Sequence, residues 1–478
     1  MFKNVKEALK YCTENDVKII DFKMIDLNGG WRHLSIPVAR LTEDTMKYGI
    51  GFDGSNYGYA PVEKSDMVFI PDLATAHEDP FCEIKTLSMC GNVYVIKEKG
   101  DNIPFDQYPR NVSLRAEEYM VKSGIADTMI VGPEFEFYLF DHVAYEVKPE
   151  VVAYEIDADC ASWNSGASDY SNLGITVPDK GGYHIAAPLD SGFDLRSKMS
   201  LLLEDWGVPV KYHHPEVGGP GQMEIEVELG AMTEMADRTM ITKYVIRNAA
   251  VAEGRTATFM PKPIYKEAGS GMHVHMLLKK NGKSVFYDAK GYAGLSKTAH
   301  YFMGGLLEHA ASLCGILNPS TNSFKRLVPG YEAPVTVGYA TSNRSAVIRI
   351  PAYAKSSETK RFELRNPDAT CNPYYAYAAI LMAGLDGVEK KIDPAARGWG
   401  PFDFNLFTLS DEEKKKLTGL PTTLDEALDA LEADHDYLTK DGVFPEALLN
   451  VWIKNKRAEA REINNIPHPA EIAKYYNM

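Results

Sequence analysis

Four short segments of this 478-residue chain alternate between apolar residues and charged or metal-binding residues. Successive side chains of a β-strand point to opposite faces, so residues of the same parity lie together on one face. As strands, all four segments have one apolar face, suited to packing against helices, and one charged face. The charged rows are Glu134 and Glu136; Glu224, Glu226 and Glu228; His273 and His275; and Arg361, Glu363 and Arg365.

The four charged faces either lie separately on solvent or converge on one cavity. Gly-Pro or Gly-Ser-Gly at the start of a segment favours a curved sheet with a polar concave face. Carboxylates and imidazoles in one cavity repel or compete unless a cation lies between them, so the pattern predicts a metal site. Oxygen ligands with a single histidine favour Mg²⁺ or Mn²⁺ over zinc.

Several arginines accompany these rows. The segment YATSNRSAVIRIP contains Arg344 and Arg349, and KRLVPGYEAP contains Arg326 and Glu332. Metals with arginines and without cysteine ligands indicate phosphoryl transfer, in which both groups stabilise phosphate charge. The chain has no GxxxxGK[ST] motif and no GxSxG motif, which excludes a P-loop ATPase and a nucleophile-elbow hydrolase. The residues alone therefore predict a two-metal enzyme that handles phosphate.

Composition narrows the class of protein further. A net charge of −15 without a basic patch excludes a nucleic-acid partner. The N-terminus does not resemble a signal peptide, and no segment approaches the ~20 apolar residues that span a membrane. Six scattered cysteines without CxxC spacing are typical of reduced thiols. We therefore expect a cytoplasmic enzyme with no membrane partner.

The order of predicted elements suggests how the chain is organised. We expect two domains, residues 1–105 and residues 106–478, because the chain exceeds the size of one core and a polar, proline-containing stretch surrounds residue 105. Residues 17–37 predict a β-hairpin that turns at Asn28-Gly29-Gly30. Residues 87–97 predict a strand, residues 141–180 a loop, and residues 424–440 an amphipathic helix.

The motifs, taken in order, resemble those of bacterial type I glutamine synthetases. They are FDGSN, GPEFEFYLF, GQMEIE, GSGMHVH, NSFKRLVPGYEAP, NRSAVIRIP and RFELRNPD, and the match runs from about residue 15 to the C-terminus. The resemblance implies an α+β fold, with a small N-terminal β-grasp domain and a larger catalytic domain whose curved antiparallel β-sheet is flanked by helices. It also implies a homo-oligomer, a dodecamer of two stacked hexamers, in which residues 1–105 contribute to the neighbouring subunit's active site.

The resemblance implies a reaction: ATP-dependent ligation of ammonia to L-glutamate through γ-glutamyl phosphate. Two Mg²⁺ or Mn²⁺ ions would be held by Glu136, Glu216 and Glu224, and by Glu134, His273 and Glu363. Glutamate would bind near Gly269, Arg326, Glu332 and Arg365, and ATP near His275, Arg344, Arg349 and Arg361. Ammonium would lie near Asp53 of the neighbouring subunit, Tyr183 and Glu216. Asp53, Glu332 and Arg344 would be the catalytic residues.

The chain departs from the family pattern at a few positions near these motifs. Asn56 and Leu277 stand where a serine is usual, Ala268 replaces an asparagine, and Lys211 replaces a glutamate near the nucleotide. Glu226 and Glu228 are additional carboxylates. In FNLFTLS, Phe407 stands where many members have a tyrosine that is modified by adenylylation. Phenylalanine has no hydroxyl group, so we expect no adenylylation at this position.

Two other functions deserve comparison. A γ-glutamyl–amine ligase of the same fold would act on a larger amine, but the retained Asp53 and Glu332 favour ammonia. A catalytically weak paralogue with a structural role is disfavoured by the complete set of metal-binding residues and arginines.

Overall fold

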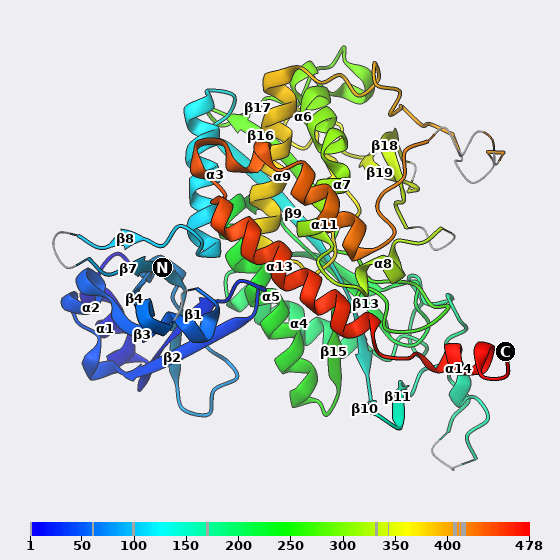
Figure 1. The fold of residues 1–478 in the computed structure, drawn as a ribbon. Helices are drawn as coiled ribbons and strands as arrows, with labels where there is room; N and C mark the ends of the chain where they lie inside the picture. Colours follow the sequence, from blue (N-terminus) through cyan, green and yellow to red (C-terminus); the bar gives the residue numbers. More distant parts are fainter. Residues whose placement is uncertain are drawn as a thin grey trace.

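The computed structural model describes residues 2–59, 62–97, 101–168, 172–329, 333–342, 344–404, 409–410, 412 and 417–478. Glu332 and Phe407, which the sequence singled out, lie outside the described residues. Figure 1 shows a small N-terminal domain, in blue, beside a larger body of sheet and helices.

Among its described residues, the N-terminal domain has two four-stranded sheets and two short α-helices. One sheet has the order β2-β1-β6-β5 and the other has the order β3-β4-β7-β8. The strands are β1 (Ile19–Ile25), β2 (Trp31–Pro37), β3 (Ile50–Asp53), β4 (Asp66–Pro71), β5 (His77–Glu78), β6 (Thr86–Met89), β7 (Gly91–Val95) and β8 (Ile103–Pro104), and the helices are α1 (Val5–Glu14) and α2 (Glu43–Tyr48).

The predicted N-terminal hairpin is confirmed, because β1 and β2 pair antiparallel with Ile25 opposite Trp31. The single strand predicted over residues 87–97 is wrong. Residues on either side of Cys90 join different sheets, β6 pairing with β1 and β7 with β4. The chain crosses from one layer to the other there, and a Cβ on Gly91 would lie 2.3 Å from the carbonyl oxygen of Ile70, so only glycine fits.

The larger domain is built around one curved sheet with the order β12-β13-β9-β16-β20-β19-β18. Its strands are β9 (Thr128–Phe140), β12 (Val210–Pro215), β13 (Gln222–Val227), β16 (Val274–Lys280), β18 (Thr336–Thr341), β19 (Ala346–Ile350) and β20 (Phe362–Leu364), and the short strands β14 (Gly230–Ala231), β15 (Thr256–Thr258) and β17 (Lys283–Ser284) pair with β9 or β16. All neighbours along the main path are antiparallel except β18 and β19, which are parallel. The expected α+β fold is confirmed.

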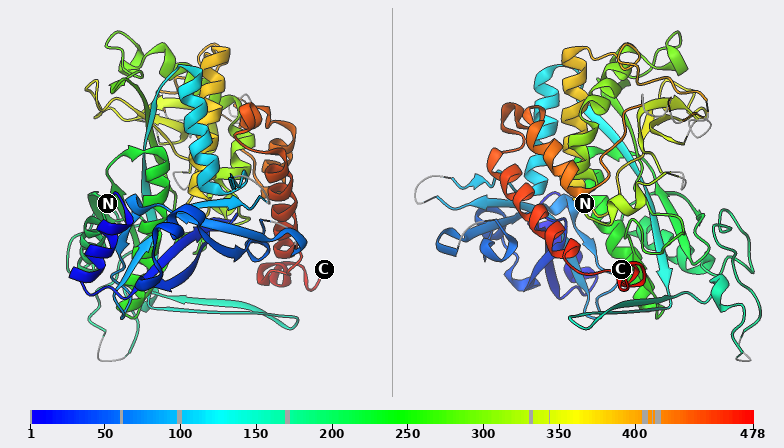
Figure 2. Two further views of the ribbon diagram at one scale, coloured as in Figure 1. Left: turned by 90° about the vertical axis from the view of Figure 1, so that its left-hand side faces the viewer. Right: turned by 45° about the vertical axis from the view of Figure 1, so that its right-hand side comes forward.

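Helices cover the apolar face of this sheet, as Figures 1 and 2 show. The described α-helices of this domain are α3 (Pro109–Ser123), α4 (Phe193–Asp205), α5 (Met232–Ala252), α6 (Lys297–Glu308), α7 (Ala310–Leu317), α8 (Ser323–Arg326), α9 (Pro373–Lys390), α11 (Leu424–Ala433), α12 (Asp436–Thr439), α13 (Glu446–Asn464) and α14 (Pro469–Tyr475), and α14 lies at the periphery with no buried residue. Helices α3 and α5 pack against β9, and α9 packs against α3 and α5. Among these described helices, none combines the length and apolar character needed to cross a bilayer.

Two further expectations need correction. Residues 141–180 are not all loop, because β10 (His142–Lys148) and β11 (Val151–Asp157) form a hairpin in which Tyr145 lies opposite Tyr154. The hairpin projects from the body (Figure 2), and these two tyrosines are 80% and 61% exposed. The helix predicted over residues 424–440 is interrupted after Ala433 and resumes as α12.

A buried arginine joins the two domains. Arg110, near the start of α3, contacts Asp237 of α5 with its Nε at 3.1 Å. Its Nη2 reaches Asp72 of the N-terminal domain at 3.0 Å, and its Nη1 donates to Asn92 at 3.2 Å. Tyr374 of α9 also donates to Asp237, at 2.5 Å. The guanidinium thereby fixes the N-terminal domain against the helices behind the sheet.

Replacing this guanidinium should destabilise the fold strongly. Arg110→Met leaves the buried Asp237 carboxylate without its cation, so we expect the free energy of unfolding in urea to fall by about 3–5 kcal/mol. Arg457→Met is the matched control, because Arg457 pairs with the exposed Asp429 and Glu432 on the surface. It should cost less than about 1 kcal/mol. Similar losses in the two variants would contradict this role for Arg110.

Candidate active site

The charged rows converge on one cavity of about 400 Å³. The predicted site residues that line it are Glu134, Glu136, Tyr183, Glu216, Glu224, Gly269, His273, Arg326, Arg344, Arg349 and Arg365. Three others, His275, Arg361 and Glu363, lie behind this wall and are buried. The polar concave face predicted from residue parity is therefore present.

The pairing of β9 with β13 places carboxylates side by side. Glu136 lies opposite Glu224 and Glu134 lies opposite Glu226, and the intervening Phe135 and Ile225 are fully buried on the other face. Glu228 does not belong to this row. It follows the last residue of β13 and is exposed, so the parity argument fails where the strand ends.

One group of ligand atoms forms around Glu216 and Glu224. Side-chain atoms of His214, Glu216 and Glu224 lie within 4.8 Å of one another. Burial, together with the nearby charges of Glu136 and Glu224, raises the pKa of Glu216 to about 9. Burial and the neighbouring glutamates raise the pKa of Glu224 as well. These carboxylates cannot all be ionised without a cation, so the donor set fits a divalent metal.

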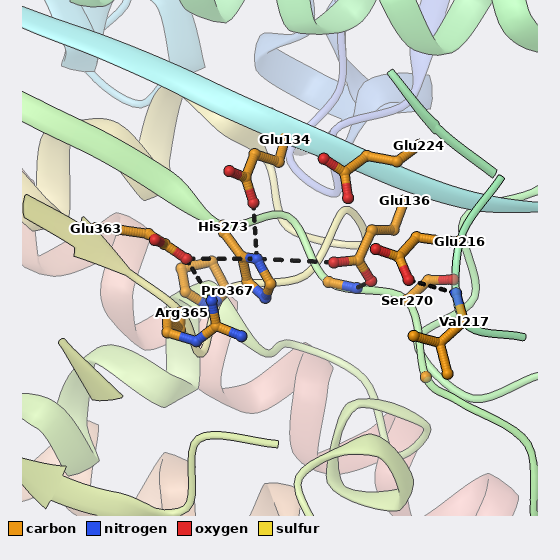
Figure 3. A network of polar contacts seen from close by, with 12 residues as sticks. Glu134, Glu136, Glu216, Val217, Glu224, Ser270, His273, Glu363, Arg365 and Pro367 are labelled. Atoms are coloured by element: carbon orange, nitrogen blue, oxygen red, sulfur yellow. Dashed lines mark hydrogen bonds and ion pairs between the residues drawn. The ribbon is translucent and has the colours of Figure 1, made fainter. Parts of the chain in front are cut away.

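A second group forms around His273 (Figure 3). Ligand atoms of Glu134, His273 and Glu363 lie within 4.8 Å of one another. His273 Nδ1 is 2.9 Å from Glu134 Oε2 and 3.6 Å from Glu363 Oε1. Burial alone would raise the pKa of Glu134, but hydrogen bonds from His273 and His275 lower it well below its usual range. These residues match the second predicted metal set.

Glu363 is more enclosed than the sequence predicted. Its side chain is fully buried, and Arg349 Nη1 and Arg365 Nη1 each contact one of its oxygens at 2.5 Å. Burial would raise the pKa of Glu363, but the Arg365 charge lowers it. The carboxylate therefore holds both arginines in place as well as facing the metal-binding group.

Three arginines carry unused hydrogen-bond donors. The Nε atoms of Arg349, Arg361 and Arg365 are buried and have no acceptor among the described residues. A buried donor without a partner costs about 1–3 kcal/mol, so these positions fit an anionic ligand such as phosphate or carboxylate. Arg344 lines the same cavity. His275 is not among the lining residues, and its Nε2 contacts Glu134 Oε1 at 2.9 Å.

Arg326 is held close to the glycine-rich loop. Its guanidinium donates to the carbonyl oxygens of Asn366 at 2.8 Å and Arg365 at 3.0 Å. A Cβ on Gly271 would lie 2.4 Å from Arg326 Nη2 and 2.9 Å from His273 Nε2. A Cβ on Gly269 would lie 2.7 Å from Arg326 Cγ. The GSG sequence is therefore required by the close approach of Arg326.

Asp53 lies apart from this cavity, in its own N-terminal domain. It ends β3 and is exposed, and it is not among the cavity-lining residues of its own chain. Ser55 Oγ donates to its Oδ1 at 2.7 Å, and Asn56 Nδ2 donates to its Oδ2 at 2.9 Å. Hydrogen bonds from Ser55, with a contribution from Asn56, lower the pKa of Asp53. The Asn56 departure thus supports the carboxylate.

The other departures have varied settings. The carbonyl oxygen of Ala268 accepts a hydrogen bond from Tyr138 at 2.7 Å, and Ala268 lines the cavity. Leu277 is buried in the hydrophobic core. Lys211 contacts Glu226 at 2.6 Å. His214, Tyr212 and Lys180 also line the cavity, although the sequence analysis did not select them; the His-His-Pro-Glu run beside Glu216 was the available signal for His214.

Comparison with known proteins decides the family. The family model described as "Glutamine synthetase, catalytic domain" matches residues 106–475, and "Glutamine synthetase, beta-Grasp domain" matches residues 16–96. The chain belongs to the glutamine synthetase family.

Relatives of the glutamine synthetase family match along the whole chain. A glutamine synthetase of Streptomyces filamentosus is 45% identical over 483 residues, covering 100% of both chains. A protein of Cupriavidus pinatubonensis named 3-hydroxylaminophenol mutase is 42% identical over 480 residues, again covering 100% of both. The solved Plasmodium falciparum glutamine synthetase superposes with a TM-score of 0.87 at 28% identity, covering 99% of each chain.

The glycine loop of this glutamine synthetase family member offers a direct test of the site geometry. Gly271→Ala should displace Arg326 and His273. Because a misplacement of about 1 Å can cost about 10²-fold in rate, we expect kcat/KM for glutamate to fall by about 10²-fold. Gly166→Ala is the control, because a Cβ there meets nothing within 4 Å. Steady-state kinetics with circular dichroism should show two folded variants of unequal activity; unchanged kcat/KM in Gly271→Ala would contradict the close packing.

Proposed function

We propose that the chain joins ammonia to the γ-carboxylate of L-glutamate at the expense of ATP, giving glutamine, ADP and phosphate. The observation that carries this proposal is the meeting, in one cavity, of buried carboxylates with Arg349 and Arg365, whose Nε–H groups have no acceptor among the described residues. Cation positions next to donors for phosphate oxygens are what phosphoryl transfer requires.

Two divalent cations are part of the proposal. Glu136, Glu216 and Glu224 would hold one ion; Glu216 and Glu224 form a ligand group with His214, and Glu136 lies opposite Glu224. Glu134, His273 and Glu363 would hold the other. Oxygen-rich donors favour Mg²⁺ or Mn²⁺. When bound, the ions would neutralise charge on the phosphate oxygens.

The side chains of this chain then orient the reactants. Arg344, Arg349 and Arg361, with His275 behind them, would hold the ATP phosphates. Arg326, Arg365 and the Gly269 backbone would hold glutamate, together with Glu332. The glutamate γ-carboxylate attacks the γ-phosphorus of ATP, and the bond to ADP breaks, which gives γ-glutamyl phosphate. Ammonia then displaces phosphate, because phosphate is a far better leaving group than oxide.

Ammonium needs a site that binds the cation and then removes its proton, because only ammonia has a free electron pair for attack. We assign this role to Asp53 of a neighbouring subunit, with Tyr183 and Glu216 of the cavity, because Asp53 is exposed and absent from the cavity wall of its own chain. Asp53 would attract the cation and accept its proton. In this proposal residues 1–105 serve the site formed by residues 106–478 of the next subunit.

The shared site requires an assembly, for which we propose a dodecamer of two stacked hexamers in the cytoplasm. The β10–β11 hairpin exposes Tyr145 and Tyr154, and Ile472 and Tyr476 are exposed in the C-terminal segment. A two-stranded hairpin is marginally stable in water by itself, so this apolar surface fits contacts between subunits.

The assay that tests the proposal measures phosphate release and glutamine formation from ATP and glutamate, with and without ammonium. We expect glutamine only when all three substrates and Mg²⁺ or Mn²⁺ are present. Product formation with polyamines and none with ammonium would instead identify the larger-amine ligase, which no described feature of the site favours. Absence of both products would contradict the proposed reaction.

The same assay separates the two chemical steps. Asp53→Ala should still release ADP with glutamate but form at least ~10²-fold less glutamine, the usual scale of a lost general base. The exposed Asp44 of α2 provides the control, and Asp44→Ala should behave as wild type. Mixed oligomers of Asp53→Ala and Arg365→Ala subunits should regain activity, since some sites then combine two intact halves. No recovery in verified mixed oligomers would exclude a shared site.

A further inference from the structure

A lysine ammonium lies beside the carboxylate row of β13, next to Glu226. Lys211 of β12 places its Nζ 2.6 Å from Glu226 Oε1, and their side chains are 24% and 2% exposed. The same Nζ lies 4.8 Å from the centre of the Tyr212 ring. The ring and the carboxylate together hold the ammonium at one position. Glu226 was unexplained by its sequence pattern, and Lys211 is its partner.

Glu226 also belongs to a third group of ligand atoms. Atoms of Glu134, Glu226 and His275 lie within 4.8 Å of one another, and all three side chains are buried. The second oxygen of Glu226, Oε2, is buried and has no hydrogen-bond partner among the described residues. His275 Nδ1 is likewise buried and unpartnered within that part of the chain. Two carboxylates, one of them with an unused oxygen, and one imidazole form a set of ligands that a divalent cation can bind.

We infer that Lys211 keeps a divalent cation out of this third group and so limits the metals that the cavity binds. The ammonium neutralises Glu226, the carboxylate that a third ion would need. It would also repel a divalent ion bound to that carboxylate, in a buried setting where charges interact more strongly than in water. A lysine suits this role because its charge is compact and hydrogen bonds through three donors.

This inference rests on the proposed two-metal site, and it makes Lys211 a determinant of metal number. Without the lysine charge, Glu226 and Glu134 become neighbouring buried carboxylates with no cation beside Glu226. Such a pair either takes up a proton or binds a cation. His275 already contacts Glu134, so its imidazole would be the third ligand of an ion bound between the two carboxylates.

Counting bound Mn²⁺ on the intact, nucleotide-free oligomer tests the inference. Free Mn²⁺ is measured by electron paramagnetic resonance, and calorimetry checks the stoichiometry. We expect Lys211→Met to bind one more Mn²⁺ per subunit than wild type. Lys211→Gln should do the same, and it retains a hydrogen-bond donor for Glu226 in case the methionine variant folds poorly. Lys211→Arg keeps the charge and should bind as wild type does.

Two controls locate the additional ion. The double variant Lys211→Met with Glu226→Gln should return to the wild-type count, because the third group has lost its carboxylate. Lys122→Met removes an exposed lysine that pairs with Asp441 and should leave the count unchanged. The wild-type count tests the two-metal proposal, whereas the difference between variants tests the inference. An equal count in wild type, Lys211→Met and Lys211→Gln, or an additional ion that persists in the double variant, would overturn it.

Discussion

The repulsion among carboxylates on β9, β12 and β13 is the constraint on which the site depends. Glu136 and Glu224 face each other across two paired strands, and Glu216 joins them from the end of β12. Burial raises the pKa of Glu216 to about 9, so the group is stable only with protons or cations. Arginines surround the carboxylates: Arg326 packs against the Gly-Ser-Gly loop, and Glu363 holds Arg349 and Arg365.

The apolar side of the same strands explains how such a site is tolerated. Phe135, Phe137 and Ile225 are fully buried against the helices, and this packing holds the carboxylate row in register. Arg110 then fixes the N-terminal domain behind the helices through Asp72 and Asp237. Asn372, at the start of α9, donates to the carbonyl oxygen of Leu27 in the hairpin turn at 3.2 Å. The fold therefore positions Asp53 at a fixed distance from the sheet but outside its own cavity.

Residue parity predicted much of this site because a strand has only two faces. It placed Glu134, Glu136, Glu224 and His273 on one cavity, and the structure brings them together. It could not show that Glu363 is enclosed by two arginines, since burial depends on contacts between distant strands. It also assigned Glu228 to the row because the end of β13 is set by the chain turning away, which alternation does not reveal.

Longer-range pairing accounts for the other differences. The β10–β11 hairpin went unrecognised because both its faces are largely exposed and its polar residues resemble a loop. Residues 87–97 look like one strand because only the pair Gly91-Asn92 marks the crossing between two sheets at Cys90. His214 was missed because a histidine in a loop-like run has no periodicity to distinguish a ligand from a surface residue.

Anomalous diffraction from crystals grown with Mn²⁺ tests the proposed two-metal site, because it locates the ions independently of turnover. We expect two strong peaks per subunit, one among Glu136, Glu216 and Glu224 and the other among Glu134, His273 and Glu363. An absence of peaks in this cavity at saturating Mn²⁺, or a single peak bound to neither group, would contradict it.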